Sequence, residues 1–226
     1  MGNSLQKRLV RKRDLEQAIR RITAHPSPKT YLEQYTIPSE VAAEILYLAA
    51  YTYNDIIGKT VVDLGCGTGR LAIAAALLGA REAVGIEIDK IAIKEATKNA
   101  ERLGVKTETD WIIGDIEAIR GNFDTVLQNP PFGVQRKRAD RKFLEKALQI
   151  GRHVYSLHKA VTAIKEKGGF LSRFIQENGG EIKAIYTLKM SIPYMFHFHH
   201  KRKHTFAVNL YIIEKKDAQL KKEKVY

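Results

Sequence analysis

The sequence predicts an α/β fold with a mostly parallel, doubly wound sheet and an antiparallel last strand. From Thr60 onward, short apolar runs alternate with segments of helical periodicity. This alternation is typical of parallel strands joined by crossover helices. Near the C-terminus, residues 182–188 and 206–212 both alternate apolar with other residues, and no helical stretch separates them. Two strands without a crossover helix should pair antiparallel.

Within the alternating region each element has its own signal. Apolar runs predict strands at Val61–Leu64, Ala83–Ile88, Trp111–Ile113, Thr125–Leu127 and near Val154–Tyr155. Helical spacing predicts helices at Leu71–Leu77, Ile93–Leu103 and Phe143–Leu148, and through Val161 and Ile164. Gly79 and Gly104 stand where the first two of these helices should end.

Two helices are expected ahead of the sheet. Asp14 opens a pattern that places Leu15 and Ile19 on one face and arginines on the other. The prolines of His25–Pro28 end this helix, and Ser39 is expected to cap the second. We therefore divide the chain into a basic helical extension, residues 1–30, and one α/β domain, residues 31–226.

Composition limits the class of protein. The chain has 226 residues, 44% of them hydrophobic, which suits a globular domain rather than a disordered segment. No apolar run approaches the roughly 20 residues of a membrane span, and the basic N-terminus lacks the apolar core of a signal peptide. We expect no membrane association and a cytoplasmic location. The single cysteine, Cys66, excludes an internal disulfide and a Cys-based zinc site.

The net charge of +13 favours a polyanionic partner such as a nucleic acid. The charge is also clustered, in runs at 7–13, 20–21, 136–142, 200–204 and 215–224. The run at 136–142 follows directly on a candidate site, described below. This arrangement points to RNA or DNA rather than to an acidic small molecule.

A glycine-rich loop, Asp63–Gly69, follows the first strand of the alternating region and opens the next helix. Glycines such as Gly65 and Gly67 allow a tight turn that brings backbone N–H groups close to a ligand, and a helix N-terminus favours a negative group. The order is Gly-x-Gly-x-Gly, with Thr68 inside it, rather than the Gly-x-Gly-x-x-Gly of dinucleotide sites. This order argues against NAD.

Carboxylates follow the next two strands. Glu87 ends the second strand, where it could accept hydrogen bonds from both hydroxyls of a ribose. Asp89 is the alternative, because alternate residues of a strand point to the same face. We favour Glu87. Asp115 and Ile116 follow the third strand, so the three strand ends together with the glycine loop predict one nucleoside pocket.

The fourth strand ends in Asn129-Pro130-Pro131-Phe132. Proline cannot donate to a strand ladder, so pairing should stop there and leave a rigid mouth. The Asn129 amide both donates and accepts hydrogen bonds, and Phe132 offers a flat apolar face. Together they suit a planar amine such as a nucleobase edge. The same four residues could also form an ordinary tight loop.

These motifs resemble those of the class I, Rossmann-like, S-adenosylmethionine-dependent methyltransferases, and Asn129–Phe132 resembles the motif of adenine-N6 methyltransferases. Together with Leu32–Tyr35 and Val154–Lys159, they resemble the archaeal and eukaryotic methyltransferase-like-five family. That family methylates an adenine of small-subunit ribosomal RNA and uses a small zinc-binding activator. The resemblance covers the chain from about Leu32 to the last strand.

The resemblance implies S-adenosylmethionine as the cofactor and RNA as the substrate. It implies a cofactor site made by Gln34, Gly65, Gly67, Thr68, Glu87, Asp115, Ile116 and Asn129. The adenine would be held by the catalytic group Asn129, Pro130, Pro131 and Phe132. Two positions depart from the human member, which has cysteine in place of Thr68 and aspartate in place of Glu87.

Two other functions stay open. Related Asn-Pro-Pro-aromatic sites methylate a protein glutamine at N5, although the strong positive charge disfavours that substrate. The chain could also be a non-catalytic RNA-binding factor of ribosome biogenesis with a remnant cofactor site. His197, His199, His200 and His204 could hold a metal, but histidines in a Lys/Arg-rich loop more often contact phosphate or solvent, so we expect no metal site.

Overall fold

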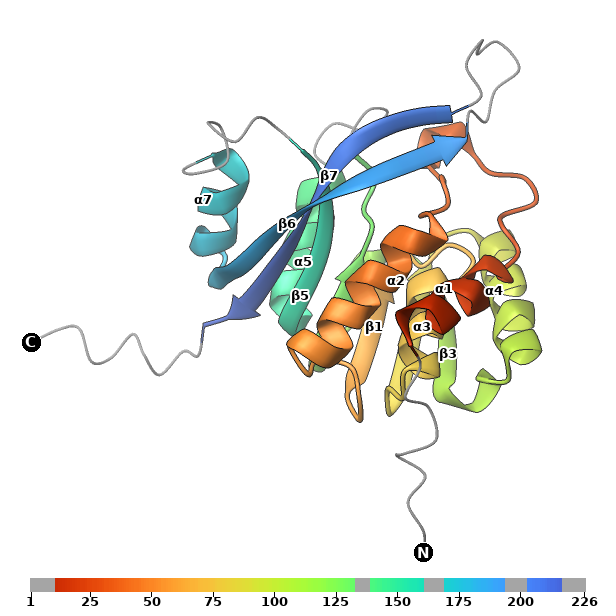
Figure 1. Ribbon diagram of the computed structural model, residues 1–226. Coiled ribbons are helices and arrows are strands. Elements are labelled where there is room, and N and C mark those ends of the chain that lie inside the picture. The colour runs from red at the N-terminus through yellow and green to blue at the C-terminus, as the bar shows by residue number, and fades with distance from the viewer. Residues whose placement is uncertain (1–10, 133–138, 161–168, 194–202, 217–226) are drawn as a thin grey trace, which may run out of the picture.

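A computed structural model describes residues 11–132, 139–160, 169–193 and 203–216 of the chain. Within these residues one seven-stranded sheet has the order β3-β2-β1-β4-β5-β7-β6 (Figure 1). The strands are β1 (Thr60–Leu64), β2 (Glu82–Glu87), β3 (Thr109–Ile113), β4 (Phe123–Gln128), β5 (Gly151–Lys159), β6 (Gly180–Pro193) and β7 (Lys203–Lys215). Strands β1 to β5 are parallel, whereas β7 runs antiparallel to both β5 and β6. The predicted fold class is confirmed.

The α-helices connect and flank these strands. They are α1 (Lys12–Arg20), α2 (Ser39–Tyr47), α3 (Arg70–Leu77), α4 (Lys90–Leu103), α5 (Ala139–Ile150) and α7 (Phe170–Glu177). Short helical turns lie at η1 (Thr30–Leu32), η2 (Leu48–Thr52), η3 (Lys106–Glu108) and η4 (Ile116–Ala118). The helix predicted through Val161 and Ile164 lies outside the described residues.

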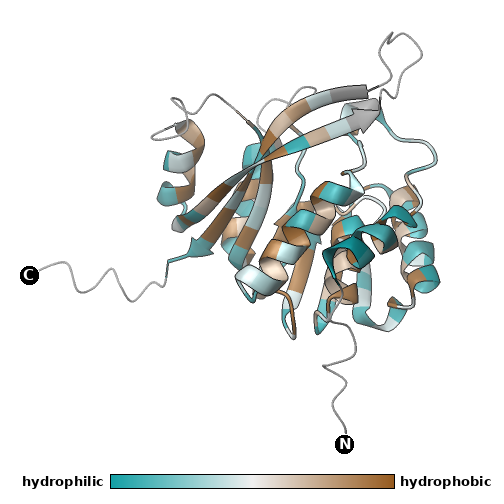
Figure 2. Cartoon of the chain, viewed as in Figure 1, coloured by the Kyte–Doolittle hydropathy of each residue, from teal (hydrophilic) through white to brown (hydrophobic). Residues whose placement is uncertain are grey.

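Each face of the sheet is covered by its own hydrophobic cluster. Val61 belongs to the cluster under α1, α2 and α3, whereas its neighbour Val62 belongs to the cluster under α5 and α7. Successive residues of a strand point to opposite faces, so strands buried on both sides need continuous apolar runs. The central strands are accordingly mostly hydrophobic (Figure 2).

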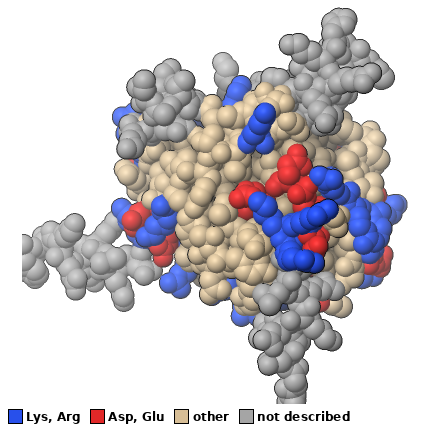
Figure 3. Space-filling model, viewed as in Figure 1, with Lys and Arg blue, Asp and Glu red and all other residues tan. Residues whose placement is uncertain are grey.

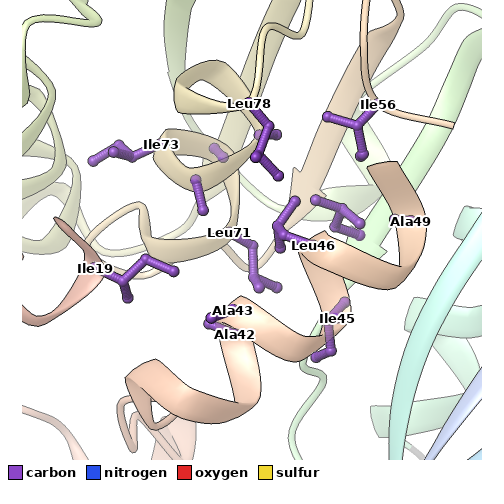
Figure 4. Close-up of a cluster of buried hydrophobic side chains, with 14 of the residues drawn as sticks. Ile19, Ala42, Ala43, Ile45, Leu46, Ala49, Ile56, Leu71, Ile73 and Leu78 are labelled. Carbon is purple, nitrogen blue, oxygen red and sulfur yellow. The ribbon is translucent and has the colours of Figure 1, made fainter. Parts of the chain in front are cut away.

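The basic N-terminal helix is packed into the first cluster. Leu15 and Ile19 of α1 are fully buried, and Ile19 gathers with side chains of α2 and α3 (Figure 4). The Asn99 amide of α4 also bonds both the N–H and the carbonyl of Thr23, at 3.0 and 3.1 Å. An apolar face of α1 therefore contributes to the core, and the division of the chain at residue 30 stays a prediction.

The predicted cap of α2 is wrong. Pro38 occupies the cap position, and Ser39 is the first helical residue. The Ser39 hydroxyl donates to the adjacent Glu40 carboxylate at 3.2 Å instead of accepting a backbone N–H. Proline has a backbone φ fixed near the value found here, −58°, so the residue before Ser39 is already set in the geometry that precedes a helix.

The order of the strands creates the site. The chain leaves β1 to pair β2 on one side, whereas β4 pairs β1 on the other. Connections therefore diverge at the carboxyl ends of β1 and β4, and ligands of open parallel sheets bind in the crevice that such a divergence leaves.

Candidate active site

A cavity of about 640 Å³ opens at the carboxyl ends of the parallel strands. Its walls come from the loops after β1, β2, β3 and β4, from the segment 31–37 and from the start of α5. Most predicted site residues line it, namely Gln34, Gly65, Gly67, Thr68, Glu87, Asp115, Ile116, Asn129 and Pro131. Pro130 and Phe132 are not among the lining residues.

The glycine loop has a backbone that only glycine adopts readily. Gly67 and Gly69 have φ values of 54° and 87°. A Cβ atom on Gly69 would lie 2.5 Å from the Trp111 ring, so this position needs glycine for space as well. A Cβ on Gly67 would meet nothing within 4 Å, because that face of the loop is open. The loop therefore offers bare backbone to the cavity.

The Glu87 carboxylate fastens this loop. Its Oε2 accepts the N–H of Gly67 at 3.1 Å, and its Oε1 accepts the N–H of Asp89 at 3.0 Å. Burial raises the pKa of Glu87, while the two backbone donors oppose that shift. One buried carboxyl group thus connects the loop after β1 with the residues after β2.

Asp89, the alternative candidate for the ribose contact, is instead the N-terminal cap of a helix. Strand β2 ends at Glu87, and Asp89 caps α4 by accepting the N–H of Ile91 at 2.9 Å. The expectation that both acids share one strand face is therefore wrong. The second oxygen of Asp89 contacts the Lys29 ammonium at 2.9 Å and the Gln34 amide at 3.3 Å. Burial alone would raise the pKa of Asp89, but these partners lower it to about 2.

The contacts of Asp89 hold one wall of the cavity. Gln34 donates to Asp89, and its amide oxygen accepts the N–H of Lys29 at 2.8 Å. A little further along, Arg70 of α3 donates to the carbonyl of Ile37 at 2.7 Å. The segment between α1 and α2 is therefore pinned to both α3 and α4. These long-range partners were not predicted, since nothing local in the sequence marks them.

Asn129 lines the cavity and carries an unsatisfied acceptor. Its Oδ1 is buried and has no hydrogen-bond partner among the described residues. The hydroxyl of Tyr35, another lining residue, is also buried and has no hydrogen-bond partner among the described residues. A buried polar atom without a partner costs about 1–3 kcal/mol, so a ligand that donates to Asn129 would recover that energy.

Phe132 packs more deeply than predicted. Its ring centroid lies 5.2 Å from that of Tyr35 and 5.8 Å from that of Phe206 in an edge-to-face contact. The side chain also packs against the main hydrophobic cluster. The flat face that Phe132 was expected to offer to a planar amine is therefore partly covered, because Phe206 arrives from a strand more than seventy residues later.

Asp63 is a lining residue to which the sequence assigned no role. The carboxyl group is buried at the end of β1, and its Oδ2 accepts the N–H of Ala72 at 3.2 Å. Burial raises the pKa of Asp63 to about 7, and the nearby Glu87 adds to this effect. Its place at the head of the glycine loop is the signal that could have marked it.

A buried polar chain lies beside Asn129. Gln128 donates to the Ser156 hydroxyl at 2.7 Å, and that hydroxyl lies 2.7 Å from Nε2 of His158. A hydroxyl can accept two hydrogen bonds and donate one, so the direction of the Ser156–His158 bond follows the tautomer of the ring. Burial lowers the pKa of His158 to about 4, which favours the neutral ring. These hydrogen bonds fix Gln128, the last residue of β4, directly before Asn129.

No group of three His, Cys, Asp or Glu residues that could hold a metal occurs among the described residues. His197, His199 and His200 lie outside them, as does the run Arg136–Arg138, and of His204 only the backbone is placed. No helix in the described part of the chain is long and apolar enough to cross a membrane. The cytoplasmic location stays a prediction.

Comparisons with known proteins decide the family. A model of a methyltransferase domain matches residues 57–219. The Drosophila melanogaster rRNA N(6)-adenosine-methyltransferase Mettl5 is 34% identical over 209 residues, which are 89% of this chain and 95% of the relative. The chain belongs to the METTL5 family of methyltransferases. S-adenosylmethionine is the cofactor of this chain, in agreement with its methyltransferase domain.

Two archaeal relatives are similar over almost their whole length. The uncharacterised protein MJ0284 of Methanocaldococcus jannaschii is 40% identical over 92% of this chain and 95% of its own. The crystal structure of PH1948 from Pyrococcus horikoshii, described as a proposed RNA methyltransferase, is 39% identical. It superposes with a TM-score of 0.83 over 93% of this chain and 100% of that one.

The cavity fits S-adenosylmethionine. Its volume of about 640 Å³ lies within the roughly 300–1,000 Å³ of small-molecule sites. The bare loop at Gly67 leaves room for close approach, and the N-terminus of α3 favours a carboxylate. Glu87 and Asp115 supply acceptors at the ends of β2 and β3 for hydroxyl and amino groups. When bound, the cofactor supplies an electrophilic methyl group on a sulfonium.

The Asp63 carboxyl makes stability depend on pH. Between its ordinary pKa of 3.8 and the folded value of about 7, the folded protein keeps a proton that the unfolded chain releases. Rising pH therefore lowers the free energy of unfolding across this range, by up to about 1.4 kcal/mol per pH unit. His158 acts oppositely between about 4 and 6.5, because there the unfolded chain binds the extra proton.

We expect Asp63→Asn to remove the Asp63 contribution, so that the slope of the free energy of unfolding against pH becomes more positive than in the wild type. Urea unfolding followed across the range from 3.8 to about 7 measures this slope. Asp110→Asn, an exposed acid on β3, is the control and should leave the slope unchanged. Equal slopes for Asp63→Asn and the wild type would contradict a protonated Asp63.

Proposed function

We propose that the chain transfers a methyl group from S-adenosylmethionine to the N6 amine of an adenine in ribosomal RNA, most specifically that of the small subunit. The observation that carries this proposal is the buried, unpartnered Oδ1 of Asn129 at the cavity wall. An exocyclic amine carries N–H groups that can satisfy it. The names of the eukaryotic relatives, rRNA N(6)-adenosine-methyltransferases, support the same substrate.

The donor would occupy the deeper part of the cavity. In this proposal its carboxylate lies over the glycine loop at Gly65, Gly67 and Thr68, and Glu87 accepts hydrogen bonds from the ribose hydroxyls. Asp115 accepts from the amino group of its adenine, with Ile116 against the ring. Gln34, whose amide is fixed by Asp89 and Lys29, completes the wall.

The acceptor chemistry would rest on the end of β4. The N6 lone pair is delocalised into the adenine ring, which makes the amine a poor nucleophile. Asn129 Oδ1 and the carbonyl of Pro130 would accept its two N–H bonds, favouring a tetrahedral nitrogen in the transition state. The nitrogen–methyl bond forms as the sulfur–methyl bond breaks, and the nitrogen proton passes to water. Pro131 keeps the mouth rigid, and the Phe132 ring, which packs against Tyr35 and Phe206, would support the wall behind the base.

RNA is the substrate class that agrees best with the positive net charge of the chain. The whole chain carries +13, and much of the excess lies in runs outside the described residues. On the face seen in Figure 3, Lys and Arg side chains gather around α1 together with acidic ones, so that face is mixed rather than purely basic. A base in a stem would also need to leave its stack to enter the cavity.

A small zinc-binding activator would suit the β3 edge of the sheet. Strand β3 is terminal in the strand order, and its Ile112 and Ile113 are 39% and 60% exposed. Ile88, directly after the residue that pairs with Ile113, is also exposed. An open edge with apolar side chains is a template for pairing with a strand of another chain. We propose that the activator pairs there.

Asn129→Ala tests the chemistry. We expect the methylation rate to fall on the order of 100-fold or more, as for the loss of one positioned acceptor. Incubation with labelled S-adenosylmethionine and unmodified ribosomal subunits, followed by nucleoside mass analysis, measures it. Asn122→Ala, in the exposed turn before β4, is the control.

Near-wild-type N6-methyladenine from folded Asn129→Ala would contradict the mechanism. If the wild type instead labels a glutamine, the substrate is a protein and not RNA. RNA binding without any methylated product would support the non-catalytic alternative.

Glu87→Ala should weaken S-adenosylmethionine binding by about 1–3 kcal/mol, because it removes the ribose acceptor and leaves the N–H of Gly67 unpaired. Titration calorimetry measures the loss. Glu82→Ala, at the exposed start of the same strand, should bind normally. An unchanged affinity for Glu87→Ala would refute the assigned ribose contact.

Ile113→Lys should lower affinity for the zinc-binding activator by about 10-fold or more, since it places a charge in an apolar contact. Ile185→Lys on β6, at the opposite edge of the sheet and 38% exposed, is the matched control. Calorimetry with the purified activator distinguishes them. An equal loss of affinity in both variants, or no loss in either, would contradict the pairing of the activator with β3.

A further inference from the structure

An aromatic side chain is exposed near the mouth of the cavity. Phe170, the first residue of α7, is 49% exposed. Its ring stacks on Phe174, one turn later, with centroids 5.9 Å apart and planes inclined by 29°. Phe174 lines the cavity, so the two rings form an apolar path from the cavity to the surface.

A guanidinium group lies on this aromatic surface. The Cζ atom of Arg141, from α5, lies 3.9 Å from the centre of the Phe170 ring. Arg141 also lines the cavity. Within the described residues, no carboxylate forms an ion pair with it, whereas the adjacent Lys142 contacts Glu117. The aromatic ring therefore contacts a cation that has no ion-pair partner in the described part of the chain.

This pair matches the chemistry of a nucleotide. The Cζ atom of the Arg141 guanidinium lies over the Phe170 ring, and a planar guanidinium has two faces and several N–H donors with which to bind further partners. Unpaired bases stack on arginine planes and aromatic rings, and the same N–H groups bind phosphate. Arg173, exposed on the same helix α7, adds a second positive charge close to Phe170.

We infer that Arg141, held by Phe170, forms a stacking subsite for an unpaired nucleobase next to the target adenine. This inference rests on the proposed RNA substrate and adds a second recognition point to it. The subsite adjoins the cavity through Phe174. The base that it holds is therefore close to the target adenine in the RNA sequence. The subsite binds substrate and takes no part in methyl transfer.

Two variants separate stacking from charge. Arg141→Lys keeps the charge and loses the plane, and Phe170→Ala loses the ring that orients the plane. Both should weaken the binding of a single-stranded RNA that contains the target adenine by about 5- to 100-fold, the range for one stacked base. Phe170→Tyr should retain wild-type affinity, and Gln176→Ala, exposed on α7, is the surface control. S-adenosylmethionine affinity should not change.

The RNA itself supplies the second half of the test. Abasic sites placed one at a time beside the target adenine should reduce wild-type affinity at one position by a similar factor. At that position the abasic site should reduce the RNA affinity of Arg141→Lys only slightly further, because this variant has already lost the group on which the base stacks. A 2-aminopurine at the same position should lose fluorescence on binding the wild type and keep it with Phe170→Ala. Fluorescence anisotropy provides the affinities.

Two results would overturn the subsite. Wild-type affinity in Arg141→Lys would mean that only charge matters there, and equal abasic penalties in wild type and variant would place the flanking base elsewhere. The proposed function is tested separately by nucleoside analysis of the wild-type product. If the wild type labels glutamine instead of adenosine, both proposals fail. If it labels adenosine and the penalties are equal, only the subsite fails.

Discussion

The buried carboxylate of Glu87 is the interaction on which the cavity depends. It binds the N–H of Gly67 on one side and the N–H of Asp89 on the other. The first contact fixes the loop that follows β1. The second sets Asp89 where it can cap α4 and hold Lys29 and Gln34. Three separate stretches of chain therefore take their positions from one side chain.

A few buried carboxyl groups therefore position the site among largely apolar residues. Glu87, Asp63 and Asp89 are all buried, yet burial raises the pKa of the first two while cationic and amide partners lower that of Asp89. The difference follows from what each carboxyl faces. Asp89 has an ammonium and an amide, whereas Asp63 has one backbone N–H and a neighbouring acid. Neighbouring acids can thus differ widely in charge state within one site.

Local signals in the sequence predicted the framework of the site. The glycine loop, the acid at the end of β2 and the double proline after β4 each act through their own backbone or their immediate neighbours, so their placement at strand ends could be inferred. Partners from distant segments could not. Lys29 meets Asp89 and Phe132 meets Phe206 only because the fold brings them together. Ser39 failed as a cap for a local reason, since Pro38 already occupied that position.

The wall formed by residues 31–37 has a kinetic consequence. Polar contacts run from Lys29 and Gln34 to Asp89 and from Arg70 to Ile37. Ile37 is also buried in the main hydrophobic cluster, and Tyr35 packs against it. Turnover requires the spent donor to leave a largely enclosed nucleoside pocket. Because residues 31–37 line the cavity but belong to no strand of the sheet, their displacement would open the pocket while the strand ends, and hence the reactive geometry, keep their positions.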